Sequence, residues 1–152
     1  MRNKTKFTIL FVAIIGIVAM LIGAFAKMDN MQTSRKFTNN DYSVGAVSVE
    51  TGKVIESKQS FYSEKLYELE GTEIKVEEDA TVTYQVFFYD EDKNYDSATE
   101  TLTEDLNLEE VPETAKYFRI MITPALVDGE PVECTMFNTL KYTSQISVTI
   151  AK

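Results

Sequence analysis

Hydrophobic and polar residues alternate most regularly in the stretch TVTYQVFFYD, which runs from Thr81 to Asp90. A period of two is typical of a β-strand, because successive side chains point to opposite faces of the sheet. The apolar face of this predicted strand consists of Val82, Tyr84, Val86 and Phe88. The opposite face carries Thr81, Thr83, Gln85, Phe87 and Tyr89, a mixture expected of a surface that meets solvent or a second layer. The pattern predicts the central strand of a sheet.

A second stretch, Lys116–Pro124, repeats the alternation. Phe118, Ile120 and Ile122 would face one way, and Tyr117, Arg119 and Met121 the other. Weaker strand patterns lie at Tyr42–Glu50, Thr99–Leu106 and Tyr142–Ile150, separated by turns such as Thr51-Gly52-Lys53. Many short strands at this spacing, without a helical period after Asp41, predict an all-β sandwich or barrel.

The run Phe7–Ala26 is uncharged and nearly all apolar. As a helix, its twenty residues would span ~30 Å, the thickness of a bilayer core. Arg2, Lys4 and Lys6 precede the run, so the N-terminus would stay in the cytoplasm and the rest of the chain would lie outside. The same residues also fit a signal peptide cleaved after Ala26. We therefore expect a signal-anchor or signal peptide over 1–26, a tether over 27–40 and a folded domain over 41–152.

Charge is distributed unevenly along the 152 residues, which suffice for one domain. The whole chain has 15 basic and 24 acidic residues and a net charge of −9. Residues 1–27 hold four of the bases and no acid, so residues 28–152 carry 11 bases and 24 acids, a net charge of −13. Such an acidic domain repels phosphate backbones, and we expect no nucleic-acid partner.

The chain lacks the residues on which much catalysis depends. Histidine and tryptophan are absent, and Cys134 is the only cysteine, so an intramolecular disulfide cannot form and a partly buried free thiol is expected. No spacing typical of a serine nucleophile appears. The paired acidic residues lie in predicted turns, where solvation keeps the pKa values of their carboxyl groups near normal. The sequence predicts a protein that is not an enzyme.

Four oxygen-bearing side chains follow the central strand at alternate positions: Asp90, Asp92, Asn94 and Asp96. This spacing is that of the first ligands in a calcium loop, and it makes calcium the one candidate cofactor. A complete calcium loop has glycine sixth and glutamate twelfth, where this chain has Tyr95 and Thr101. The alternative is a solvated hairpin turn.

A candidate ligand platform follows from pairing the two strongest strands. If they are neighbours, one face brings together Gln85, Phe87, Tyr89, Tyr117 and Arg119. Aromatic rings beside a guanidinium suit a small ligand or an envelope saccharide. The alternative is that a loop or a second sheet covers this face.

Several short motifs occur in a recurrent order: Gly45-Ala46-Val47, Thr51-Gly52-Lys53, Tyr84–Asp90, Asp92–Tyr95, and Pro112 before Ala115–Ile120. This order resembles the jelly-roll, galactose-binding-like modules of bacterial surface proteins and phage tail or fibre proteins, over roughly Asp41 to Pro124. The resemblance implies a jelly-roll-type β-sandwich that binds carbohydrate or mediates attachment. The chain departs from sugar-binding members in having no tryptophan.

Two functional hypotheses result. The first is a membrane-anchored extracytoplasmic binding module that recognises an envelope saccharide. The second is a non-enzymatic accessory or structural protein that docks another cell-envelope protein. The first hypothesis requires the predicted platform to be exposed, whereas a buried platform would favour the second.

Overall fold

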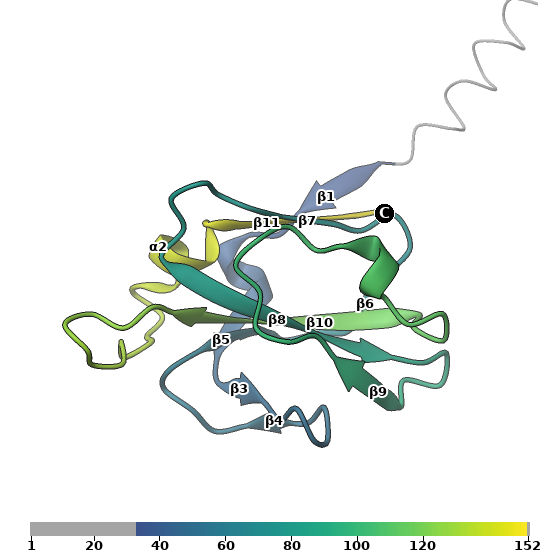
Figure 1. Ribbon diagram of the computed structural model, residues 1–152, viewed down its shortest axis with the longest axis horizontal. Helices are drawn as coiled ribbons and strands as arrows, with labels where there is room; N and C mark the ends of the chain where they lie inside the picture. The colour runs from purple at the N-terminus through teal and green to yellow at the C-terminus, as the bar shows by residue number, and fades with distance from the viewer. Residues whose placement is uncertain (1–32, 152) are drawn as a thin grey trace, which may run out of the picture. The chain divides into compact units, whose positions relative to one another are not determined.

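The computed structural model describes residues 33–151, and the folded unit spans Ser34–Lys152. The predicted membrane segment 7–26 lies outside the described residues. Within residues 33–151, no helix is both long and apolar enough to cross a membrane. The regular secondary structure of the described chain consists almost entirely of antiparallel β-strands, as the sequence predicts (Figure 1).

The larger sheet has the strand order β2-β5-β10-β8-β9, with β6 also paired to β10. Its strands are β2 (Tyr42–Val44), β5 (Phe61–Ser63), β6 (Tyr67–Glu68), β8 (Val82–Tyr89), β9 (Tyr95–Ala98) and β10 (Tyr117–Pro124). The two long strands, β8 and β10, are neighbours over eight residues, and together they form the centre of the sheet.

The smaller sheet has the order β1-β11-β7 and lies on one side of the larger sheet (Figure 1). It contains β1 (Ser34–Lys36), β7 (Glu73–Val76) and β11 (Ile146–Ala151). A separate hairpin of β3 (Ala46–Val47) and β4 (Val54–Ile55) lies on the other side (Figure 1). Two short 3-10 turns, η1 (Asn39–Asp41) and η2 (Leu108–Glu110), and one helix, α2 (Thr139–Thr143), complete the regular structure.

The hydrophobic core fills the space between the two sheets. It contains Tyr42, Phe61, Ile74, Val82, Tyr84, Val86, Phe88, Phe118, Ile120, Ile122, Tyr142, Ile146, Val148 and Ile150. The predicted inner faces of β8 and β10 are confirmed, because all seven of their apolar side chains are at most 4% exposed. The described domain is thus a sandwich-like all-β fold.

Three predicted boundaries are wrong. The folded unit begins at Ser34 rather than Asp41, because β1 pairs with β11 inside the predicted tether. The predicted strand Tyr142–Ile150 begins only at Ile146, because its first residues complete α2. The segment Thr99–Leu106 is not a regular strand, although it pairs locally with β8 through the bridge between Leu102 and Tyr84 and a hydrogen bond from Thr99 to Val86. In each case the hydrogen bonds of the main chain determine the secondary structure. Alternation of polar and apolar residues does not reveal these bonds in such short segments.

A polar network joins the two sheets. Arg35 on β1 donates two hydrogen bonds of 2.9 Å to the carboxylate of Asp41 in η1, and the Tyr67 hydroxyl on β6 donates a third, of 3.0 Å. Burial alone would raise the pKa of Asp41, but the hydrogen bonds from Arg35, the Thr38 amide and Tyr67 outweigh it and lower the pKa to about 2. The guanidinium of Arg35 also lies over the rings of Phe37 and Tyr67.

Candidate functional site

The predicted platform forms as a contiguous face. In the register of β8 and β10, Arg119 lies opposite Phe87, Tyr117 opposite Tyr89, and Met121 opposite Gln85. The pairing of the two strands therefore brings the five candidate residues together on the outer face of the larger sheet.

The β3–β4 hairpin covers the centre of this face. Val47 on the hairpin is 3% exposed, and it packs with Phe87 and Tyr89 in a second hydrophobic cluster. Phe87 is fully buried and Tyr89 is 4% exposed. The exposure that the saccharide hypothesis requires is thus contradicted for these two rings, and the alternative of a covered face is correct.

Two tyrosine hydroxyls hold the hairpin loop. Tyr89 donates a hydrogen bond of 2.6 Å to the carbonyl of Gly52, and Tyr95 donates one to the carbonyl of Val49. Gly52 has φ +64°, as expected from the Thr51-Gly52-Lys53 turn, and it lies directly against the Tyr95 ring. Burial raises the pKa of Tyr89, so its hydroxyl stays protonated and able to donate at neutral pH.

The three polar members of the platform have partners within the domain. Arg119 donates a hydrogen bond of 2.9 Å to the carbonyl of Glu64, and its guanidinium lies over the ring of Tyr62. Gln85 donates to the carbonyl of Thr99, and the ammonium of Lys93 lies 5.3 Å from the ring centre of Tyr117. These contacts give the face a structural role, although ligand binding by these residues stays a prediction.

The acidic turn after β8 is closed by its own hydrogen bonds. Asp90 accepts from the backbone N–H of Asn94 at 2.8 Å and from its side-chain amide at 3.1 Å, and both bonds lower the pKa of Asp90. Asp96 accepts from the Ser97 hydroxyl. Across residues 33–151, no three side chains of His, Cys, Asp or Glu are grouped to hold a metal ion. Calcium binding by Asp90, Asp92, Asn94 and Asp96 stays a prediction.

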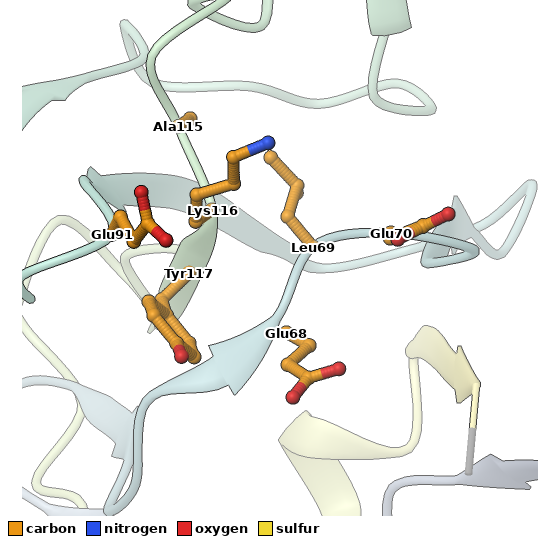
Figure 2. Close-up of a pocket in the computed structure, with 7 residues that line it drawn as sticks. All are labelled: Glu68, Leu69, Glu70, Glu91, Ala115, Lys116 and Tyr117. Atoms are coloured by element: carbon orange, nitrogen blue, oxygen red, sulfur yellow. The ribbon is translucent and has the colours of Figure 1, made fainter.

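A hollow of about 500 Å³ lies at one end of the larger sheet, beside β6 and the start of β10. It is lined by Glu68, Leu69, Glu70, Glu91, Ala115, Lys116 and Tyr117 (Figure 2). Glu70 lies at the far end of the hollow from Glu91, so the carboxylates do not converge on one point (Figure 2). We find no arrangement of acid, base and nucleophile there.

A surface that the sequence patterns did not predict lies at α2 and the turn before it. Met136 is 87% exposed, Phe137 is fully exposed and Leu140 is 62% exposed. The buried side of the same helix carries Thr139 and Thr143 with Tyr142. We call Met136, Phe137 and Leu140 the α2 patch.

Local hydrogen bonds explain why this region buries its threonines and exposes its apolar residues. Asn138 accepts from the Thr135 amide at 2.8 Å and donates to the carbonyl of Glu133 at 2.9 Å, which fixes the turn before α2. Thr139 and Thr143 donate to carbonyls one turn earlier, so their hydroxyls are satisfied although they are buried. The threonines therefore face the domain, and the large apolar residues point to solvent. The sequence held one signal of this surface: in MFNTL, Met136, Phe137 and Leu140 are one, three and four positions apart, a spacing that places side chains on one side of a helix.

Comparison of the chain with known protein families, with curated proteins and with solved structures found no match.

Proposed function

We propose that this protein is a membrane-anchored extracytoplasmic interaction module, without catalytic activity, that docks another cell-envelope protein through the α2 patch. One observation carries the proposal: the turn before α2 exposes Phe137, and α2 exposes Leu140 while it buries two threonines. Single exposed apolar residues are ordinary, but three neighbours in five positions form a patch of the kind that partners cover.

The burial of the predicted platform supports this choice over saccharide recognition. Phe87 and Tyr89 would have to stack on a sugar, and the hairpin already occupies their face. The α2 patch, in contrast, is exposed without any rearrangement of the domain.

Membrane attachment and the jelly-roll type are further parts of the proposal. Attachment rests on the apolar run Phe7–Ala26 and the basic residues before it. The jelly-roll type and the resemblance to galactose-binding-like modules rest on the motif order, with which two antiparallel sheets are compatible.

The size of the native complex tests the proposal. The full-length protein is extracted from the membranes of its host in mild detergent and separated by native electrophoresis. We expect a complex larger than the detergent-bound monomer, loss of that complex in Phe137→Ser, and its retention in Leu126→Ser. Leu126 is a matched control, because it is an apolar residue that is 64% exposed but lies outside the α2 patch. A wild-type protein that migrates as a monomer would overturn the proposal, and so would a complex that Phe137→Ser leaves intact.

A further inference from the structure

The outer edge of the larger sheet lies beside the α2 patch. Strand β2 is at the end of the strand order, so one side of it has no neighbour in the described sheet. A hollow of about 430 Å³ adjoins this edge. Its lining includes Tyr42 and Val44 from β2 and Met136 and Thr139 from the α2 region. We call this hollow the β2 groove.

The main chain of β2 directs hydrogen-bonding groups into the open side. The carbonyl of Asp41 accepts from Glu64, and the amide of Gly45 donates to Ser60, so residues 41, 43 and 45 face β5. In an antiparallel ladder the alternate residues, Tyr42 and Val44, then direct their N–H and C=O groups to the other side. The amide of Tyr42 already donates a hydrogen bond to the carbonyl of Asn39. Within residues 33–151, no hydrogen bond engages the carbonyl of Tyr42 or either main-chain group of Val44, so these groups can pair with a partner strand.

We propose that the β2 groove binds an extended, basic peptide segment of a partner protein, which adds a strand to the larger sheet beside β2. An extended main chain supplies the donors and acceptors that the edge of β2 lacks. Alternate apolar side chains of the peptide enter the groove against Val44 and Met136. This inference rests on the proposed function and names the chemistry of the partner.

Charge selects a basic segment and disfavours a second copy of this chain. Residues 28–152 carry a net charge of −13, and the charged side chain that lines the groove is Glu64. Two copies of so acidic a domain repel each other, whereas lysine or arginine side chains on the outward face of the peptide are attracted.

A synthetic ten-residue peptide that alternates lysine and valine serves as the probe. Its binding to the full-length protein in detergent is measured by fluorescence anisotropy at physiological salt. We expect it to bind at least tenfold more tightly than a peptide that alternates glutamate and valine. Methylation of alternate backbone nitrogens in the lysine peptide should abolish binding, because it removes the donors of one edge without changing charge. Equal binding of the methylated peptide, or of the glutamate peptide, would overturn the inference.

Variants locate the site. Val44→Pro removes one edge donor while leaving the ladder to β5 intact, and it should weaken binding about tenfold. Tyr42→Phe removes only a buried hydroxyl and leaves the main chain of β2 unchanged, so it should bind the lysine peptide as wild type does. Met136→Ser should weaken binding, whereas Leu126→Ser should not. If Val44→Pro unfolds the domain, the methylated peptide gives the same test with the protein unchanged.

The two proposals fail in different ways. A native complex that depends on Phe137, together with no binding of the lysine peptide, would refute strand addition and leave the proposed function in place. Absence of any native complex would refute the proposed function itself. A lysine peptide that binds equally well to Val44→Pro and to wild type would place its binding site elsewhere.

Discussion

The contact between Gly52 and the Tyr95 ring gives the sharpest test of the covered sheet face. In Gly52→Ala, the new Cβ would lie 2.3 Å from Cδ2, 2.5 Å from Cγ and 2.8 Å from Cβ of Tyr95. The Cβ of Tyr95 is fixed by the strand to which it belongs, so the ring cannot simply rotate away. A positive φ of 64° adds backbone strain for any residue with a side chain.

These two effects set the expected magnitude. Left-handed backbone strain costs about 1–2 kcal/mol, and overpacking against a fixed ring costs about 1–3 kcal/mol. We therefore expect Gly52→Ala to lower the free energy of unfolding by about 2–5 kcal/mol, a large part of the stability of a small domain. Urea unfolding followed by tyrosine fluorescence measures this change.

Gly129→Ala is the matched control. Gly129 also has a positive φ, of 83°, but no atom lies within 4 Å of the position that a Cβ would take there. This variant should show only the backbone strain, about 1–2 kcal/mol. Hydrogen exchange adds a local measure, because undocking of the hairpin would speed exchange at the amide of Val47, which donates to the sulfur of Met121 on β10. If Gly52→Ala matches Gly129→Ala in both stability and exchange, the hairpin does not cover the sheet as described.

Three further predictions follow from the core and from two ionisable groups. Val86→Asp should destabilise the domain by several kcal/mol, because Val86 is fully buried and the new carboxylate has no partner; a variant that melts like the parent would refute the core assignment. Because the pKa of Asp41 is about 2 in the fold, against 3.8 ordinarily, its contribution to stability is present above about pH 4 and is lost as pH falls toward 2. By pH 3 the loss is about 1 kcal/mol, and Asp41→Asn should remove this part of the acid slope in urea titrations; an unchanged slope would argue against the network with Arg35. Cys134 is buried and its pKa is raised to about 11, so its thiol should react with a disulfide reagent at pH 8 only after unfolding; rapid reaction of the native protein would contradict its burial.

The long strands were predictable because their pattern is local. In β8 and β10, apolar side chains recur at every second position over eight residues, and this pattern indicates the face that packs between the two sheets. The neighbouring position of the two strands, assumed for the platform, is also as predicted.

The cover over the platform was not predictable in the same way. It depends on β3, a strand of two residues, and on hydrogen bonds from Tyr89 to Gly52 and from Tyr95 to Val49, across 37 and 46 positions of the chain. A strand so short has no measurable period, and the sequence pattern does not indicate which distant segment will lie on a mixed face.

The α2 patch escaped prediction for a related reason. The sequence pattern predicted no helix after Asp41, because the side of α2 that packs on the domain carries Thr139 and Thr143 rather than an apolar stripe. Both threonines donate to carbonyls four residues earlier, so their hydroxyls can be buried. Only the packing of α2 on the domain shows that Phe137 and Leu140 point outward.

Photo-crosslinking in living cells tests most directly the central claim that the α2 patch docks a partner protein. A photoreactive phenylalanine analogue is placed at Phe137 and, as the reference, at Glu100, an exposed residue outside the patch. The account predicts a discrete crosslinked product with another protein from position 137, at a yield at least tenfold above that from position 100. Equal yields at the two positions, or no crosslinked protein from position 137, would contradict it.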